Sequence, residues 1–240
     1  MIRRDADRFA VMARARETAA ERPLIIDPFA ALFTAAADGG ADLAPGCRRA
    51  VTDFVAARTK WFDEFFLTAG SAGVTQVVLL APGSDTRAWR LPWLSDTVIY
   101  EVDDPDDLHD KGSVLATAGA QPAAKYVPVP ADLTGDWPRE LTAAGFDHGE
   151  PTAWAAEGLL PTLSPDAAQH LFDRIALYSA RGSRVAVDAV RSFDAAGWLC
   201  DRCWETTGID AAELLHRYHR DPVVDDAALA ETVFVSARLL

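Results

Sequence analysis

The chain has 240 residues, 50% of them hydrophobic, which is enough to bury one sizeable core and predicts one structural domain. Its formal net charge of -13 repels nucleic-acid phosphates and anionic membrane surfaces. The densest positive stretch, residues 3–16, is interleaved with acidic residues as on a solvated helix face. We therefore expect neither a nucleic-acid nor a membrane partner.

The first seventy residues are predicted to be helical and to form a cap or lid. Apolar residues recur at helical spacing in residues 9–16 and again in 51–68, which predicts a long amphipathic helix there. A short helix is expected over 29–36, followed by a loop rich in Gly, Ala and Pro over 37–46. The apolar side chains that this lid is expected to offer a substrate are Phe9, Met12, Trp61 and Phe65.

After Gly70 short apolar runs alternate with helical stretches, which is typical of βαβ units and a parallel sheet. The run QVVLL at residues 76–80 predicts a strand buried on both faces. Further strands are predicted at residues 97–102, 125–129, 152–156, 183–187, 204–208 and 232–237. Helices are predicted between them at residues 106–117, 137–144, 165–179, 194–203 and 211–218. Residues 71–240 are thus predicted to form a doubly wound, mostly parallel, seven-stranded α/β sheet.

The cysteine content and the lack of long apolar segments indicate in which cellular compartment the protein is expected. Three cysteines do not make a disulfide framework, and no apolar run near the first residues reads as a leader. We therefore expect a cytoplasmic protein. Cys200 and Cys203 form a C-x-x-C pair that His216 and His219 could complete, but their spacing is not that of a zinc site, so we expect no metal.

The loop after the first predicted strand, APGSDTR at residues 81–87, lies where a parallel sheet opens a crevice for ligands. Gly83 allows the backbone to approach a ligand closely, and the following helix turns its amides toward it. The G-x-G-x-x-G pattern and the P-loop lysine are both missing. The loop alone is therefore weak evidence, and it is unlike a dinucleotide-binding loop.

The second predicted strand ends in EVDDP, residues 101–105, about twenty residues beyond Gly83. A carboxylate at this place, Asp103, can accept hydrogen bonds from two ribose hydroxyls. That chemistry suits any adenosine-containing cofactor. The alternative is that Asp103 only caps the helix that follows.

Five motifs in order resemble the leucine carboxyl methyltransferase-like family, and in particular its bacterial branch associated with O-methylation of polyketides and other small molecules. These motifs are RTKWFD at 58–63, QVVLLAPGSDTRAWRLPW at 76–93, EVDDP at 101–105, DL at 132–133 and AEGLL at 156–160. The stretch ARARETAAERPLIIDPFAALF, residues 13–33, is similar to that branch as well. The resemblance implies a class I, Rossmann-like methyltransferase that uses S-adenosyl-L-methionine and releases S-adenosyl-L-homocysteine.

The resemblance also implies roles for individual residues. Arg58 would pair with the cofactor's carboxylate and Glu157 would lie near its amino group, although a surface ion pair and a helix-capping carboxylate are the plain alternatives. Gly83 would approach the methionine portion, with Asp85 and Arg87 shaping the loop. The remaining residues implied to hold the cofactor are Asp103 at the ribose and Asp132 and Leu133 at the adenine.

Two departures from the family pattern concern the cofactor tail and the acceptor. Pro82 and Ser84 stand where the family more often has a small and a hydrophobic residue beside the glycine. Pro161 and Thr162 follow AEGLL where the family usually has an apolar residue and Tyr, so an aromatic hydroxyl expected in the acceptor pocket is missing.

The predicted reaction is methyl transfer to an oxygen, carboxylate or hydroxyl, of a small-molecule acceptor by a monomer or homodimer. A carboxylate is ionised at pH 7 and needs no base, whereas a phenol or enol gains from one. The candidates for a catalytic base are Glu157, His216 and His219. The alternatives are a C- or N-methyltransferase of an aromatic metabolite, a cofactor-binding protein without turnover, and a nucleotide-sugar or nicotinamide enzyme.

Overall fold

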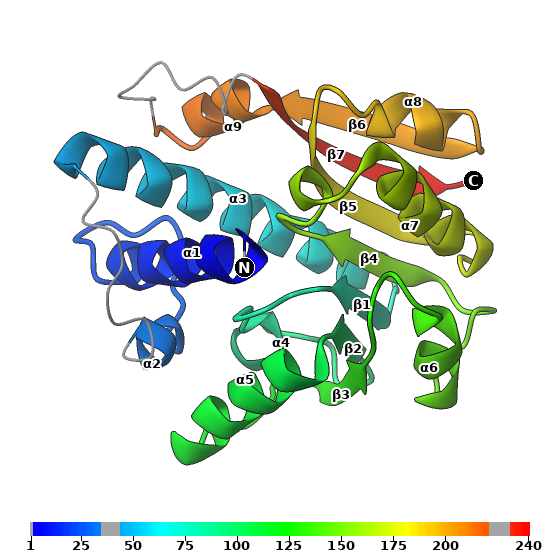
Figure 1. Cartoon of the computed structure of the whole chain (residues 1–240), viewed down its shortest axis with the longest axis horizontal. Coiled ribbons are helices and arrows are strands. Elements are labelled where there is room, and N and C mark those ends of the chain that lie inside the picture. The colour runs from blue at the N-terminus through cyan, green and yellow to red at the C-terminus, as the bar shows by residue number, and fades with distance from the viewer. Residues whose placement is uncertain (1, 35–43, 221–230) are drawn as a thin grey trace.

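Seven strands form one sheet through the middle of the part of the chain that the structure describes (Figure 1). The computed structural model describes residues 2–34, 44–220 and 231–240, with side chains from residue 7 onward. The strands are β1 (Gln76–Leu80), β2 (Val98–Asp103), β3 (Lys125–Pro130), β4 (Thr152–Ala156), β5 (Arg184–Val190), β6 (Trp204–Asp210) and β7 (Thr232–Leu239).

The strand order is β3-β2-β1-β4-β5-β7-β6. The pairs from β3 to β5 are parallel, and β7 is antiparallel to both of its neighbours, β5 and β6. The order reverses direction between β1 and β4, which makes this the point where such sheets bind ligands. The predicted doubly wound, mostly parallel sheet of seven strands is confirmed.

The N-terminal helices are α1 (Ile2–Thr18), α2 (Ala30–Thr34) and α3 (Pro45–Ser71). The helix α3 begins six residues before the predicted start because Pro45 stands at a first-turn position, where its missing N–H costs nothing. Residues 45–50 are largely exposed, so no apolar periodicity marks them in the sequence. Most of the predicted loop at 37–46, and the end of the predicted helix at 29–36, lie outside the described residues.

The remaining helices connect the strands. They are α4 (Arg87–Arg90), α5 (Pro105–Thr117), α6 (Trp137–Ala143), α7 (Pro165–Leu177), α8 (Ala195–Cys200) and α9 (Ala211–Arg217), with a 3-10 turn, η2, at Leu160–Thr162. The helix α7 starts as predicted, since the side chain of Ser164 accepts a hydrogen bond from the amide of Ala167. The helix α8 ends before the predicted residue 203, because Cys203 has a left-handed φ of 65°.

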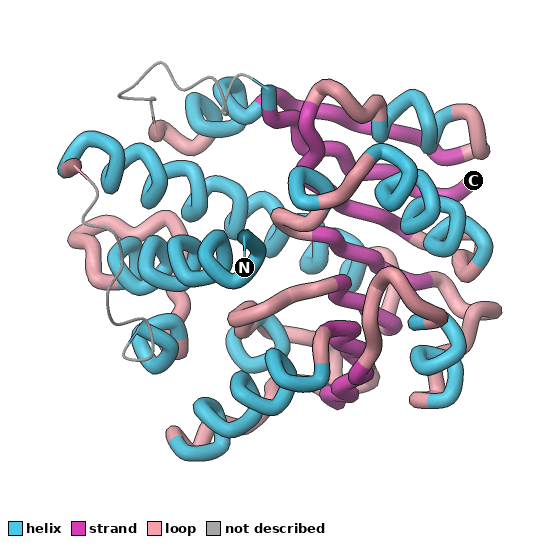
Figure 2. The backbone as a smooth tube through the Cα atoms, viewed as in Figure 1, coloured by secondary structure: helices cyan, strands magenta, loops and turns pink. Residues whose placement is uncertain are grey.

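Helices cover both faces of the sheet (Figure 2). Alternate residues of β1 serve the two faces: Val77 and Leu79 pack in a cluster with α3, α4, α5 and α9, and Val78 and Leu80 pack in a cluster with α6, α7 and α8. All five residues of β1 are buried, as the continuous apolar run predicts. The helix α3 therefore belongs to the layer that covers the sheet, and α1 lies beside it (Figure 1).

Among the residues described, no helix combines the length and the apolar character needed to span a lipid bilayer.

Candidate functional site

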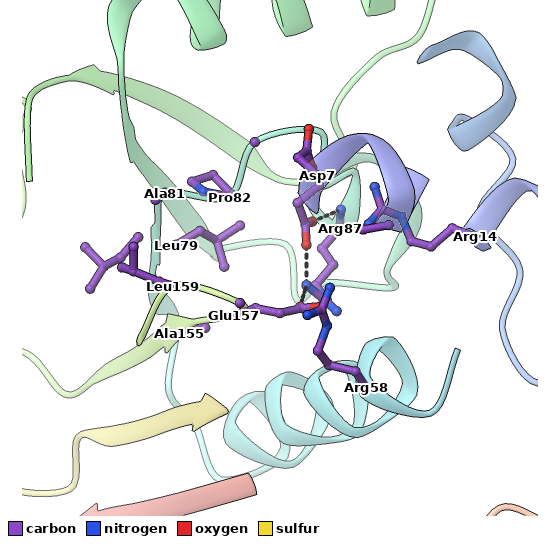
Figure 3. Close-up of a pocket in the computed structure, with 15 residues that line it drawn as sticks. Asp7, Arg14, Arg58, Leu79, Ala81, Pro82, Arg87, Ala155, Glu157 and Leu159 are labelled. Atoms are coloured by element: carbon purple, nitrogen blue, oxygen red, sulfur yellow. Dashed lines mark hydrogen bonds and ion pairs between the residues drawn. The ribbon is translucent and has the colours of Figure 1, made fainter. Parts of the chain in front are cut away.

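A cavity opens at the carboxyl ends of β1 and β4 (Figure 3). Five segments form its wall: α1, α3, the end of β1 with the loop after it, α4, and the end of β4 with the loop after it. Its volume is about 100 Å³, whereas small-molecule pockets usually measure roughly 300 to 1,000 Å³. Part of the wall must therefore move before a ligand of cofactor size can enter.

Gly83 and Asp103 meet at the edge of this cavity. The amide of Gly83 donates a 2.8 Å hydrogen bond to Oδ2 of Asp103, and the amide of Asp104 donates one of 2.8 Å to Oδ1. Gly83 has a left-handed φ of 54°, a conformation that favours glycine. Asp103 ends β2 and is buried, while the adjacent Asp104 caps α5 by accepting from the amide of Asp106. Asp103 is thus more than a helix cap, since Asp104 takes that role.

The helix α1 approaches the glycine loop through Asp7. The carboxylate of Asp7 accepts a 2.7 Å hydrogen bond from Oγ of Ser84 and a 3.1 Å bond from its amide. A Cβ atom added at Gly83 would lie 2.9 Å from Cγ of Asp7, so only glycine permits this approach. Arg14, two turns further along α1, donates to the carbonyl and hydroxyl oxygens of Ser84. Ser84, one of the departures from the family pattern, is therefore the residue on which α1 docks.

Arg87 is buried behind the loop and holds several acids together. Its Nε donates to Asp63 at 2.7 Å and its Nη1 donates to Glu157 at 2.6 Å; Nη1 also pairs with Asp85. Burial by itself would lower the pKa of Arg87, but the carboxylates of Asp85, Glu157 and Asp63 raise it. Arg87 is therefore a permanent cation. The pKa of Asp85 is lowered in turn, because Arg87 and its neighbouring cations outweigh the effect of burial.

Arg58 of α3 and Glu157, which follows β4, meet in the wall of the cavity (Figure 3). Nε of Arg58 lies 3.0 Å from Oε1 of Glu157, and Nη1 lies 3.6 Å from Oδ2 of Asp188. The Nε group is nevertheless buried without hydrogen-bond geometry to any acceptor among the described residues. Gly158 leaves room for this guanidinium, since an added Cβ would lie 3.2 Å from Nη1. Arg58 thus keeps a buried donor that a ligand anion can use.

Two buried acids close to the site were given no role by the sequence motifs, although one of them, Glu101, is the first residue of EVDDP. Asp188, on β5, accepts a 2.6 Å hydrogen bond from the amide of Gly158, and burial raises its pKa although Arg58 opposes the shift. Glu101, on β2, pairs with Lys111 at 2.5 Å, and burial raises its pKa to about 6 despite that lysine. Lys111 also donates to the carbonyl oxygen of Asp85 at 3.0 Å, which links this pair to the loop.

Asp132 and Leu133 follow β3 and lie apart from the first cavity. Asp132 is exposed, and its carboxylate accepts hydrogen bonds of 2.8 Å from the amide and the hydroxyl of Thr134, which lower its pKa. Leu133 lines another hollow, of about 130 Å³, beside α7. Both residues lie at the carboxyl edge of the sheet, but neither lines the cavity around Gly83.

Several other predicted residues lie away from the cavity. His216 and His219 are exposed near the end of α9, and neither lines it. Pro161 and Thr162 are exposed in η2, whereas Leu159 just before them does line it. Trp61 and Phe65, which are expected to offer apolar contacts to a substrate, line a separate cavity on β6 and β7 and not the cavity around Gly83.

The structure thus brings together most of the residues implied by the family resemblance. Those that line the cavity are Arg58, Gly83, Asp85, Arg87 and Glu157, with Asp103 bonded to Gly83. Asp7, outside the quoted motifs, and Arg14, in the stretch of residues 13–33 but given no role there, complete the wall from α1. Both lie in the interleaved charged stretch of residues 3–16, whose pattern indicates only a solvated helix face.

Comparison with known proteins agrees with this geometry. Residues 9–176 match the model of a family described as leucine carboxyl methyltransferase. A protein of Mycolicibacterium gilvum with the provisional name S-adenosyl-L-methionine-dependent methyltransferase is 53% identical over 231 residues, covering 95% of this chain and 91% of that protein.

Two solved structures have the same fold at low sequence identity. One is a provisionally described methyltransferase from Thermobifida fusca, with a TM-score of 0.51, 16% identity and coverage of 95% of this chain and 94% of that one. The other is magnesium protoporphyrin IX methyltransferase from Synechocystis, solved with its bound cofactor, with a TM-score of 0.52, 9% identity and coverage of 80% and 84%.

Proposed function

Because the chain belongs to the leucine carboxyl methyltransferase family and is an S-adenosyl-L-methionine-dependent methyltransferase, we propose that it methylates an oxygen, specifically a carboxylate oxygen, of a small organic acid. The observation that carries this proposal is the lining of the cavity around Gly83. Among the described residues, the lining contains three arginines and no histidine, lysine, tyrosine or cysteine. Its carboxylates, those of Asp7, Asp85 and Glu157, are all engaged by hydrogen bonds or ion pairs.

This lining favours an acceptor that arrives already ionised. A carboxylate is deprotonated at neutral pH and needs no general base, whereas a phenol or an alcohol must lose a proton. The guanidinium groups of Arg14, Arg58 and Arg87 offset the three carboxylates of the wall, so the lining does not repel an anionic acceptor. The family name, leucine carboxyl methyltransferase, points to the same class of acceptor.

The residues present fit the cofactor. The buried Nε of Arg58 is ion-paired with Glu157 but has no acceptor in hydrogen-bond geometry among the described residues, and the cofactor's methionine carboxylate would provide one. Glu157, held between Arg58 and Arg87, would accept from the methionine ammonium group. Asp103 would accept from the ribose hydroxyls in place of its bond to Gly83, and Asp132 and Leu133 would border the adenine.

When bound, S-adenosyl-L-methionine supplies a methyl group on a positively charged sulfur, which leaves as the neutral thioether of S-adenosyl-L-homocysteine. A C–S bond breaks and a C–O bond forms, and with a carboxylate acceptor no proton is released. The protein's task is therefore to hold the carboxylate in line with the methyl group and to exclude water. The apolar residues Leu79, Ala155 and Leu159 contribute to the exclusion of water.

We further propose that residues 1–70 contain the lid of this site, with α1 as its moving part. The cavity is too small for the cofactor, and α1 narrows it with Asp7, Ala10 and Arg14. The contacts of α1 with the glycine loop are the polar ones of Asp7 and Arg14 with Ser84, so moving α1 away from the loop would cost less than displacing α3, which packs on the sheet. Opening at α1 is therefore the least costly way to admit the cofactor.

The acceptor class can be tested without knowing the acceptor. The protein is incubated with methyl-labelled cofactor and a small-molecule extract of Mycolicibacterium gilvum, the source of the 53% identical relative. The products are then treated with mild alkali. A methyl ester releases its label as volatile methanol, whereas methyl ethers and N- or C-methyl products keep it. We expect volatile label, with no proton uptake or release during the transfer at pH 7.

Three outcomes would contradict the proposal. Label that stays with the product after alkali, with one proton released per transfer, would identify a hydroxyl or nitrogen acceptor. Label fixed in a carbon–carbon bond would identify a C-methyltransferase. Tight cofactor binding without transfer to any component of the extract would favour a binding protein.

A further inference from the structure

A second and larger cavity, of about 460 Å³, lies on the face of the sheet that α3 and α9 cover. It is at the opposite end of the strands from Gly83 and Glu157. Arg184 is the first residue of β5 and Glu205 the second of β6, whereas the first cavity lies beyond the last residues of β1 and β4. The two cavities are therefore separate, and α3 runs past both of them, with Arg58 at one and Trp61 at the other.

Three arginines line this second cavity in a chain whose net charge is -13. Arg184 comes from β5, Arg238 from β7 and Arg217 from the last turn of α9. Within residues 7–34, 44–220 and 231–240, no carboxylate forms an ion pair with any of them. These three guanidinium groups line the wall of one cavity without a carboxylate partner among the described residues, so this cluster is a local site for anions.

The two acids of the cavity wall do not neutralise the cluster. Glu64 is taken up by Lys60, at 3.0 Å, and by the hydroxyl group of Tyr218, at 2.7 Å. Glu205 is the cross-strand neighbour of Arg238, yet its exposed side chain makes no ion pair with it. In the described part of the chain, one carboxylate without an ion pair, that of Glu205, therefore stands against three guanidinium groups.

Arg184 carries a buried charged donor that an anion could satisfy. Its Nε is inaccessible to solvent and has no acceptor among the described residues, which is a costly state for a charged donor. Arg184 and Arg238 also stand directly opposite each other in the antiparallel pairing of β5 and β7. Like charges at such positions repel, and an anion between them would turn the repulsion into attraction.

The opposite wall is aromatic. Trp61 and Phe65 of α3, one turn apart, are both half-buried and both line the cavity. The Trp61 ring is fixed from behind by Phe62 and Phe234, whose ring centroids lie 5.0 and 5.2 Å away. A rigid flat apolar wall facing a row of guanidinium groups suits a planar organic anion, and the volume is that of a small-molecule pocket.

We propose that this cavity is a second ligand site, which binds a planar aromatic carboxylate between Trp61 and Phe65 on one side and Arg184, Arg217 and Arg238 on the other. The carboxylate lies over the two strand arginines, and the ring packs on Trp61. The site is independent of the cofactor site.

Naphthalene-2-carboxylate is a suitable probe for the whole chain, with naphthalene-2-carboxamide as the neutral control of the same shape. Binding is measured by calorimetry and by the change in tryptophan fluorescence, in the presence of saturating S-adenosyl-L-homocysteine. We expect one saturable site for the carboxylate and about tenfold weaker binding of the carboxamide, as for the loss of a charge-assisted hydrogen bond. Replacing Arg184→Gln or Arg238→Gln should weaken carboxylate binding to a similar extent and leave carboxamide binding unchanged.

Two further variants sharpen the test. Thr207→Trp on β6 keeps all three arginines but fills the cavity, so it should abolish binding of both compounds. Arg181→Gln removes an exposed arginine that does not line the cavity and should change nothing. Absence of saturable binding up to about 1 mM, equal affinity for both compounds, or displacement of the probe by S-adenosyl-L-homocysteine would each overturn the proposal.

Discussion

The amide of Gly83 donates a 2.8 Å hydrogen bond to Oδ2 of Asp103, across the gap between the ends of β1 and β2. Twenty residues separate the two along the chain, and the parallel pairing of β1 with β2 brings their ends together. The bond holds the buried carboxylate at the place where an adenosine ribose binds in folds of this kind. It also gives that carboxylate a partner while the ribose hydroxyls are absent.

Replacing Asp103→Ala should weaken binding of S-adenosyl-L-homocysteine by about 2 kcal/mol, because a charge-assisted hydrogen bond to the ribose is lost. Calorimetric titration of the purified variant measures the change. Asp104→Ala is the matched control, since this neighbouring carboxylate is exposed and caps α5 instead. Equal affinity of the Asp103 variant and the unchanged chain would show that the ribose binds elsewhere.

The lid proposal predicts a kinetic effect at Asp7. The Asp7→Ala variant loses its hydrogen bonds to Ser84, so α1 should open more readily and the cofactor should associate about tenfold faster. Stopped-flow tryptophan fluorescence follows the association. Glu21→Ala, an exposed residue after α1, serves as the control. Slower association together with weaker binding would mean that Asp7 contacts the bound cofactor rather than closing its entrance.

The sheet was largely predictable from the sequence, because buried parallel strands are short continuous apolar runs. Residues 76–80 and 152–156 match β1 and β4 to the residue. The ends of the edge strand were harder to predict. The strand β6 extends to Asp210, and because it pairs with a neighbour on one side only, the burial of its residues does not alternate regularly. The start of α3 was missed because its first turn faces solvent and carries no periodic signal.

The candidate site was predictable only in part. The single glycine of the loop and the aspartate of β2 are weak signals alone, and their order with Arg58 and Glu157 made the resemblance specific. Asp7 and Asp188 could not be found in this way. Asp7 and Ser84 are 77 residues apart in the sequence, and Asp188 and Gly158 are 30 apart. Neither aspartate lies in a motif that would predict its hydrogen-bond partner.

Of the three candidate bases, Glu157 lines the cavity and His216 does not, which predicts different results for their variants. Glu157→Gln leaves Arg58 and Arg87 without their shared carboxylate, so the KM for the cofactor should rise roughly tenfold to hundredfold. His216→Gln should keep kcat and KM within about twofold, because His216 is exposed and does not line the cavity. Steady-state kinetics over pH 6 to 9 measures both. A fall in kcat for the His216 variant, with loss of a titration near neutral pH, would restore that histidine as the base.

The buried pair of Glu101 and Lys111 predicts how stability depends on pH. Burial raises the pKa of Glu101 from 4.5 to about 6 in the folded protein, so the folded state binds this proton more tightly than the unfolded state. The stabilising contribution is complete below pH 4.5 and is lost as pH rises through 6, and it amounts to about 2 kcal/mol.

In Glu101→Gln, the side chain stays neutral throughout. The free energy of unfolding of the variant relative to the unchanged chain should therefore rise by about 2 kcal/mol between pH 4 and pH 7. Urea unfolding at several pH values measures this difference, and Glu150→Gln, at an exposed site, should show none. If the difference in the free energy of unfolding between the Glu101 variant and the unchanged chain stays constant with pH, the pKa of Glu101 is the same in the folded and the unfolded state. Lys111 would then fully offset the effect of burial.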